Sequence, residues 1–180
     1  RRGAKGNPDE YVERLVAVFY QGRRVLTDDG SVWLNLGDSY TSGNRGYRAP
    51  DKKNPVRAMS YRAKTPEDLK PKDLVGIPWR VAFALQKAGW YLRSDIIWEK
   101  PNCMPESVKD RPTRSHEYLF LLSKSLRYYY DYQSIREENG RNRRTVWSIP
   151  TEPFSGAHFA TFPPRLVEPC ILAGSEPDDW

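Results

Sequence analysis

The stretch GIPWRVAFALQKAGWYLRSDIIWEKPN, residues 76–102, decides the fold of this chain. Pro78 suits the first turn of a helix, where its missing N–H costs no hydrogen bond, and Gly89 suits the position just past a helix end. The residues from Trp90 to Trp98 are largely aromatic and β-branched, which is typical of a strand. This stretch therefore predicts a helix that leads into a strand.

The residues before this stretch predict the same order of elements. Asn7 is a suitable helix cap, Pro8 and two acids follow it in the first turn, and apolar residues recur on one face to about Leu26. TDDG then turns the chain, and residues 31–38, SVWLNLGD, alternate apolar side chains as a mostly buried strand does. A helix joined to a strand by a short turn is half of an α/β unit.

The residues after this stretch predict more strands and a last helix. EYLFLLSKS (117–125) is typical of a strand, and LRYYYD (126–131) and RTVWSIP (144–150) of shorter strands. Pro163 and Pro164 open the helix. Its expected buried side holds Leu166, Val167, Ile171 and Leu172, with Gly174 past its end. We expect an α/β fold with a mostly parallel sheet, and an antiparallel pair at one edge where two late strands follow without a helix between them.

The composition indicates one compact basic domain. The 180 residues hold 29 Lys and Arg against 23 Asp and Glu, a net charge of +6 that favours a polyanionic partner, with nucleic acid first. No stretch approaches the ~20 consecutive apolar residues that cross a bilayer. Cys103 and Cys170 fit neither a zinc site nor a disulfide framework. We expect no metal and a cytoplasmic location.

Residues 40–72 are polar and basic, and directly follow a predicted strand. They hold nine Lys and Arg against three acids. We interpret them as a mobile loop, because loops of this length in compact domains are either functional or disordered. Its cations could hold phosphates while Tyr40, Tyr47 and Tyr61 stack on bases, although a charged run is more often simply solvated.

Four blocks of sequence carry a resemblance to a known family. They are EYVERLVAVF with RRVLTDDGSVWLNLGDSY, residues 76–102, RPTRSHEYLFLLSKS, and SGAHFATFPPRLVEPCILAGS. In this order and spacing they resemble the circularly permuted, β-class DNA amino-methyltransferases, a family that includes prophage-encoded and restriction-modification enzymes. The resemblance covers nearly the whole chain outside the basic loop.

The resemblance implies a three-layer, Rossmann-like fold and a reaction. The family transfers a methyl group from S-adenosylmethionine to the exocyclic amine of adenine or cytosine in double-stranded DNA, with the target base flipped out. Its catalytic Asp/Ser-Pro-Pro-Tyr motif does not occur in this chain, and neither does its Gly-rich donor turn. We therefore expect residues 1–180 to be a single partial domain, incomplete at both ends, whose catalytic residues are unknown and which is inactive or nearly so alone.

The resemblance also assigns sites to residues of this chain. FPPR, at 162–165, matches the donor block rather than the catalytic motif. Residues 131–150 are a candidate target-recognition segment. The expected donor contacts are His158, Phe159, Thr161, Phe162 and Pro163. The expected target-base pocket contains Asn35, Gly37, Asp38, Lys100, Asn102, His116 and Glu117. The expected DNA contacts are Arg45, Arg48, Lys52, Lys53, Arg111, Arg114, Arg141, Arg143 and Arg144.

Plainer interpretations of these residues remain open. His158 to Pro163 could be only a helix start with core aromatics, Gly37 and Asp38 only a turn with a cap, and Lys100 with Asn102 only a solvated turn. At the level of function, the chain could be a DNA-binding module that no longer uses the donor. A methyltransferase for RNA or small molecules is a weaker alternative, because a fold alone does not name a substrate.

Overall fold

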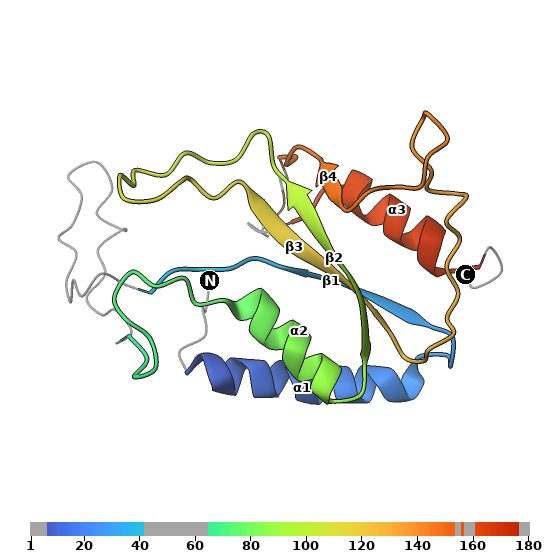
Figure 1. Cartoon of the computed structure of the whole chain (residues 1–180), viewed down its shortest axis with the longest axis horizontal. Coiled ribbons are helices and arrows are strands. Elements are labelled where there is room, and N and C mark those ends of the chain that lie inside the picture. The colour runs from blue at the N-terminus through green and yellow to red at the C-terminus, as the bar shows by residue number, and fades with distance from the viewer. Residues whose placement is uncertain (1–6, 42–64, 154–155, 157–160, 177–180) are drawn as a thin grey trace.

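The computed structural model describes residues 7–41, 65–153, 156 and 161–176, and they form one sheet with helices on both faces (Figure 1). The strand order is β1-β3-β2-β4. The elements are α1 (Pro8–Val25), β1 (Ser31–Leu36), α2 (Ile77–Lys87), β2 (Tyr91–Glu99), β3 (His116–Ser123), β4 (Val146–Ser148) and α3 (Pro164–Gly174).

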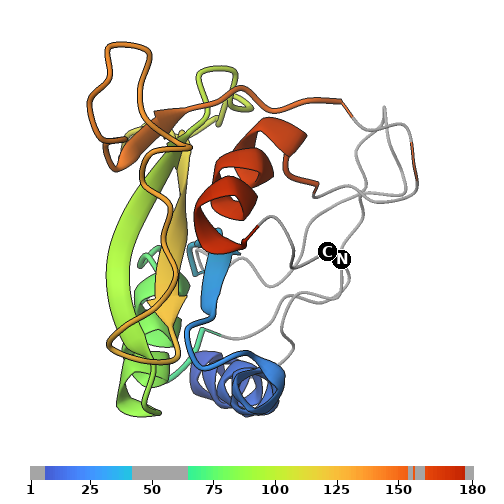
Figure 2. The ribbon, with the colours of Figure 1, turned by 90° about the vertical axis from the view of Figure 1, so that its right-hand side faces the viewer.

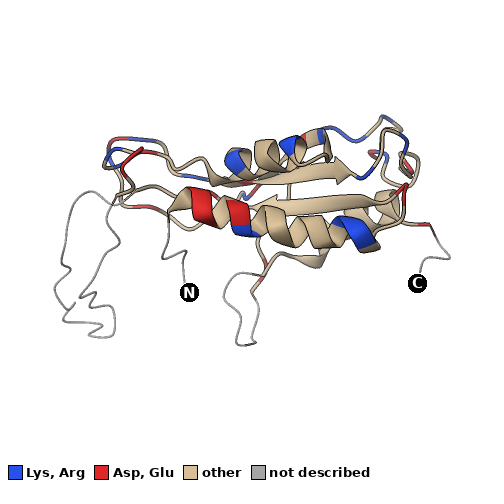
Figure 3. Ribbon diagram, turned by 90° about the horizontal axis from the view of Figure 1, so that it is seen from below, with Lys and Arg blue, Asp and Glu red and all other residues tan. Residues whose placement is uncertain are grey.

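Helix α1 begins and ends as its sequence predicts. The Asn7 side chain accepts a hydrogen bond from the backbone N–H of Asp9 at 3.2 Å. Asp9 and Glu10 lie in the first turn, and Arg23 and Arg24 lie in the last. Figure 3 shows this separation of charge along α1, with the acids near its start and the basic residues near its end. The arrangement is favourable, because the helix dipole is positive at the N-terminus and negative at the C-terminus.

Two glycines set the ends of α2. Gly76 caps its start with φ +76° and Gly89 follows its end with φ +97°, both in the left-handed region that L side chains rarely adopt. The chain then enters β2 at Tyr91. The predicted helix and strand of residues 76–102 are therefore confirmed.

The prediction of a mostly parallel sheet is wrong. Strand β3 is antiparallel to both β1 and β2, and the parallel pair among the described strands is β2 with β4. The excursion of residues 100–115 contains no helix, so the chain reverses direction between β2 and β3 and pairs antiparallel. This antiparallel pair is also central rather than at an edge, since β1 and β4 flank it.

Each face of the sheet has its own hydrophobic core. On one face Val81 and Leu85 of α2 pack with Phe120 and Leu122 of β3. On the other face Leu166 and Cys170 of α3 pack in a cluster with Trp98 and Trp147. In Figure 2, α3 lies on one side of the sheet, and α1 and α2 lie next to each other, apart from α3. The sheet is thus a rigid platform that holds the ends of β1, β2 and β3 in fixed positions.

Two local predictions are wrong. Residues 126–131 form no strand. Their rings contact other side chains instead: Tyr130 stacks on Trp33, with ring centroids 6.4 Å apart, and the guanidinium of Arg93 lies over the Tyr128 ring. Helix α3 buries Leu166, Pro169, Cys170 and Ala173, whereas Ile171 and Leu172 are 39% and 46% exposed.

Gly174 is also the last residue of α3 rather than a residue past its end. A Cβ there would lie 2.7 Å from Nε1 of Trp33, so the close approach of α3 to β1 requires glycine.

Candidate functional site

Three strands bring polar residues together at one end of the sheet. Strands β1 and β2 end there, and β3, which runs antiparallel to both, begins there, at the left of Figure 1. The register pairs Leu36 with Tyr118 and Glu99 with His116. Gly37, Lys100, His116 and Glu117 therefore lie at the same end of the sheet, as expected for a site at the carboxyl ends of strands.

Lys100 and Glu117 form an ion pair at this end of the sheet. The Nζ atom of Lys100 donates to Oε1 of Glu117, and the two side chains are 17% and 27% exposed. The same Nζ lies 4.1 Å from the centroid of the Trp98 ring, which holds it by a cation–π contact. Trp98 is itself fixed, because its Nε1 donates to the carbonyl of Ile149 at 2.8 Å.

Asp38 anchors the turn after β1 to the start of α2. Its side chain is 2% exposed. Its Oδ1 accepts from the backbone N–H groups of Ser39 at 2.8 Å, Gly76 at 3.0 Å and Ile77 at 3.1 Å. The largely buried guanidinium of Arg114 lies 3.9 Å from its other oxygen. The plainer interpretation of Asp38 as a cap is therefore correct, but it caps a helix that begins 38 residues further along the chain, which the sequence pattern did not reveal.

The two asparagines predicted for the pocket cross-link the backbone. Asn35 donates through Nδ2 to the carbonyl of Tyr118 at 3.1 Å. Asn102 donates to the carbonyl of Thr151 at 2.9 Å and accepts from the N–H of Thr151 at 2.8 Å. Asn102 thus ties the turn after β2 to the segment that follows β4.

His116 stands edge-on to Tyr118, with ring centroids 5.4 Å apart. Burial lowers the pKa of His116, and the positive charge of Arg114 lowers it further. The imidazole is therefore neutral near pH 7, when it can both donate and accept a hydrogen bond.

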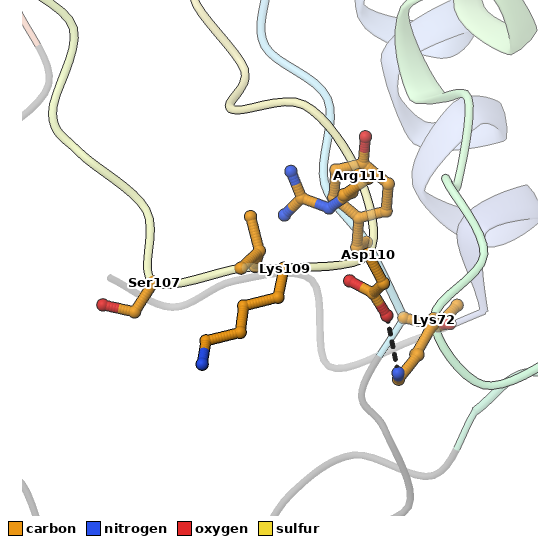
Figure 4. Close-up of a pocket in the computed structure, with 8 residues that line it drawn as sticks. Lys72, Ser107, Lys109, Asp110 and Arg111 are labelled. Atoms are coloured by element: carbon orange, nitrogen blue, oxygen red, sulfur yellow. Dashed lines mark hydrogen bonds and ion pairs between the residues drawn. The ribbon is translucent and has the colours of Figure 1, made fainter.

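A hollow of about 800 Å³ opens between the loops that extend from this end of the sheet (Figure 4). It is lined by Tyr40, Thr41, Lys72 and residues 107–111. The guanidinium of Arg111 lies 3.7 Å from the centroid of the Tyr40 ring, and Lys72 pairs with Asp110 at 2.6 Å. Three of the lining residues were predicted from sequence as DNA contacts or as part of the basic loop, namely Tyr40, Lys72 and Arg111. The others were not predicted, because residues 107–111 show no regular pattern of apolar and polar side chains.

The residues expected to contact the donor lie around the start of α3. His158 and Phe159 lie outside the described residues. Thr161 and Phe162 are exposed, Phe162 by 52%, and Pro163 is buried. Phe162 lines an apolar hollow of about 480 Å³ together with residues of α3, including Val167, Ile171 and Leu172.

Comparison with known proteins identifies the family. The family described as DNA methylase, the N6 and N4 methyltransferases, matches residues 1–180. This chain belongs to that family. It is 65% identical over 99% of its length to the Type II methyltransferase M.Cfr9I of Citrobacter freundii, and 62% identical over 97% to M.SmaI of Serratia marcescens.

The methylase chain spans 61% and 62% of the length of these two relatives. Among solved structures, the cytosine-N4-specific PvuII DNA methyltransferase matches 99% of the chain and 60% of its own with a TM-score of 0.71 at 19% identity. A putative DNA modification methylase of Thermus thermophilus, solved with S-adenosyl-L-methionine, matches 91% of the chain and 58% of its own with a TM-score of 0.57 at 18% identity. At such identities these two structures support the fold alone.

The described arginines that are expected to contact DNA fall into two groups in this chain. Arg111 and Arg114 lie at the strand ends, where Arg111 donates to Glu106 at 2.6 Å and thereby lowers the pKa of that carboxyl. Arg141, Arg143 and Arg144 belong to the segment that precedes β4, and this segment runs near α3 and away from residues 100–115 (Figure 1). Arg45, Arg48, Lys52 and Lys53 lie outside the described residues.

The second group differs in how its side chains are held. The guanidinium of Arg143 lies 4.4 Å from the centroid of the Trp147 ring, and its Nε is buried with no hydrogen-bond partner in the described part of the chain. Arg144 donates to Glu137 at 2.9 Å, which raises the pKa of Arg144. Arg141 is exposed. Arg144 is exposed as well, but Arg141 has no ion-pair partner among the described residues, so its charge remains available to DNA.

The described residues place no group of three or more His, Cys, Asp or Glu side chains where they could hold a metal ion. In the same part of the methylase chain, no helix combines the length and apolar character that crossing a membrane requires. Cys170 is buried, and burial raises its pKa to about 12, so this thiol stays protonated and unreactive at neutral pH.

Proposed function

We propose that this chain forms the target-base side of a DNA amino-methyltransferase. The enzyme transfers a methyl group from S-adenosylmethionine to the exocyclic amine of adenine or cytosine in double-stranded DNA, and the target base is flipped out of the duplex. The observation that supports this proposal most directly is the meeting of Gly37, Lys100 and Glu117 at one end of the sheet in a chain of the DNA methylase family.

The chemistry of this group suits the edge of a nucleobase. Glu117 offers a carboxylate that accepts hydrogen bonds from an amine, and Lys100 offers an ammonium that donates to ring nitrogens or a carbonyl. Hydrogen bonds accepted from the amine free its nitrogen lone pair from ring conjugation, which methyl transfer requires. Because the pair is largely buried and Trp98 fixes Lys100, these groups meet a base in a set position.

The donor side is proposed at the start of α3. The exposed ring of Phe162 and the apolar hollow beside it fit the flat, weakly polar face of an adenine. Thr161 and Pro163 flank Phe162. His158 and Phe159, which the family resemblance also assigns to this site, belong to the same proposal. The donor supplies the activated methyl group, and the residues of this chain bind and orient it.

Alone, this polypeptide is proposed to have little or no activity, because its sequence contains no Asp/Ser-Pro-Pro-Tyr motif. The test uses a chimera in which residues 1–180 replace the matching 61% of the Citrobacter relative. Methyl transfer from radiolabelled donor to unmethylated plasmid DNA by the chimera, and none by the isolated chain, supports the proposal. An inactive but folded chimera, or clear turnover by the isolated chain, contradicts it.

A DNA-binding module without donor chemistry is the second candidate, because the chain carries a net charge of +6 but lacks the catalytic motif. Calorimetry with S-adenosylmethionine separates the two. If the chain is part of an enzyme, the chimera should bind S-adenosylmethionine at micromolar concentrations. If the chain is a DNA-binding module, it should bind DNA and no S-adenosylmethionine.

Self-association is also proposed through the uncovered edge of the sheet. Strand β1 pairs with β3 on one side, and the described residues provide no partner on its other side. The exposed side chains of Phe162, Ile171 and Leu172 add apolar surface on α3. Unpaired strand edges and apolar patches favour association. Light scattering should show the mass rising with concentration, and a strict monomer at high concentration would count against this proposal.

A further inference from the structure

The hollow beside Tyr40 contains charges that the proposed target-base and donor sites do not use. Lys72, Lys109 and Arg111 line it together with one acid, Asp110. Arg111 is already engaged, since it donates to Glu106 at 2.6 Å and lies over the Tyr40 ring. The charges that remain for a ligand are therefore the ammonium groups of Lys72 and Lys109.

These two lysines differ in their present contacts. Lys109 is exposed and has no ion-pair partner among the residues that the structure describes, and in Figure 4 its side chain points away from the Lys72–Asp110 pair. Lys72 pairs with Asp110, but both side chains are largely exposed, by 72% and 56%. An exposed ion pair of this kind contributes little to stability, so a competing anion can displace Asp110 from Lys72 at small cost.

The backbone also directs Lys72 to this place. Its φ is +71°, a left-handed conformation that no other non-glycine residue of the described ranges adopts. Such conformations are uncommon for residues with a Cβ, and they persist where the surrounding structure holds them. Here Lys70 accepts from Thr41 and Asp73 through its carbonyl, which closes the turn around Lys72.

We propose that this hollow is a phosphate subsite, in which Lys109 and Lys72 each bind a backbone phosphate of the DNA that carries the target base and Asp110 releases Lys72 when the phosphate arrives. This inference rests on the proposed function, because it takes the Lys100–Glu117 pair as the position of the base. The Lys100–Glu117 pair lies at the end of β2 and the start of β3, and the hollow lies beyond the same end of the sheet, between the segment that joins β2 to β3 and the turn before α2 (Figure 1). A phosphate contact there fixes the register of the strand and carries no sequence information.

The sign of one substitution distinguishes this subsite from a structural ion pair. Asp110→Asn removes the carboxylate that competes with the phosphate for Lys72, so it should tighten DNA binding with little change in the dependence of log affinity on log salt, because Lys72 contacts a phosphate in both complexes. Lys109→Ala should weaken binding equally on all sequences and reduce that slope by about 0.9, the amount that one phosphate contributes. Lys72→Gly, which suits φ +71°, should abolish the gain from Asp110→Asn.

Matched variants control for net charge. Asp28→Asn removes a carboxylate that pairs with Lys124 at 3.0 Å and is 97% exposed, far from the hollow before β1. Lys87→Ala removes an exposed lysine at the end of α2. The experiment titrates the full chain and its variants into a fluorescent duplex of mixed sequence, about two helical turns long, over a salt series, and follows anisotropy.

The proposal is supported if Asp110→Asn tightens DNA binding more than Asp28→Asn does, and if Lys109→Ala reduces the slope more than Lys87→Ala does. It is overturned if Asp110→Asn and Asp28→Asn act equally, if Lys109→Ala leaves the slope unchanged, or if the chain does not bind DNA. Inorganic phosphate at constant ionic strength is the second probe: it should compete with DNA less well in Lys109→Ala, and equal competition also overturns the subsite. Failure of the proposed function would appear separately, as a chimera that binds DNA with these slopes but transfers no methyl group.

Discussion

The carboxylate of Glu117 packs against Gly37, so that a Cβ added at residue 37 would lie 3.3 Å from both Cδ and Oε1 of Glu117. Oε1 is the atom that accepts from Lys100. The turn after β1 therefore sets the position of an ion pair made between β2 and β3, and Gly37 is part of the site through its missing side chain.

Gly37→Ala should disturb the pair without unfolding the protein. The added methyl group must push the Glu117 carboxylate by a few tenths of an ångström, which loosens its bond to Lys100. We expect methyl transfer by the chimera to fall about tenfold, because small displacements of positioned groups are costly in catalysis. Gly22→Ala in α1 is the control, since it meets nothing within 4 Å and should raise stability by about 0.5–1 kcal/mol. Equal activity of the two variants would contradict the assignment of Gly37.

Asp38→Ala should destabilise the fold by about 2–3 kcal/mol, which is the loss of a helix cap together with buried hydrogen bonds. Three backbone N–H groups lose their acceptor, two of them at the start of α2. Asp38→Asn keeps the Oδ1 acceptor and loses only the charge that faces Arg114, so it should cost clearly less. Urea unfolding of the three proteins measures the difference. If the two variants are equally unstable, the charge of Asp38 matters more than its capping bonds.

His116 should make the free energy of unfolding decrease as the pH falls below about 7. Burial and Arg114 lower its folded-state pKa below the value of 6.5 that an unperturbed histidine has. As the pH falls through about 6.5, the unfolded chain takes up a proton that the folded protein resists. The free energy of unfolding therefore decreases from about pH 7 towards about pH 5, with a smaller decrease in His116→Asn. Identical pH profiles for the two proteins would show that His116 does not contribute.

The three arginines of residues 141–144 should give different phenotypes. Arg141→Ala should weaken DNA binding with little change in melting temperature. Arg143→Ala should also lower the melting temperature, because it removes the cation–π contact with Trp147, worth about 0.5–2 kcal/mol. If Arg143 reads bases as well, its loss relaxes sequence preference more than affinity, whereas a uniform loss across sequences assigns it to phosphate. Fluorescence anisotropy on a panel of duplexes measures this. Arg144→Ala is the comparison, because the guanidinium of Arg144 is already bound to Glu137.

The order of helices and main strands could be predicted from sequence because local signals specify it. Asn7, Pro8, Gly76 and Gly89 act within a few residues of the elements that they begin or end. The direction of pairing could not be predicted, because an alternating strand is equally compatible with parallel and antiparallel neighbours. The aromatic run at residues 126–131 has strand propensity, yet its rings pack on Trp33 and Arg93 instead of forming a ladder.

The site was partly predictable for a similar reason. Gly37, Lys100 and Glu117 follow or begin strands, so their position at a sheet end follows from the pattern. The capping role of Asp38 and the hollow at Tyr40 depend on contacts between residues about 30 to 70 positions apart, namely Asp38 with Gly76 and Tyr40 with Arg111. No local pattern encodes such contacts, and they appear only when the chain is folded.

The central claim, that Lys100 and Glu117 hold the target base, is tested most directly by methyl transfer in the chimera with Glu117→Gln and Lys100→Met. Both variants keep the shape of the side chain and remove one member of the ion pair. We predict that kcat falls at least about tenfold in each, while calorimetry shows unchanged binding of S-adenosylmethionine. Wild-type kcat in both variants would contradict the claim.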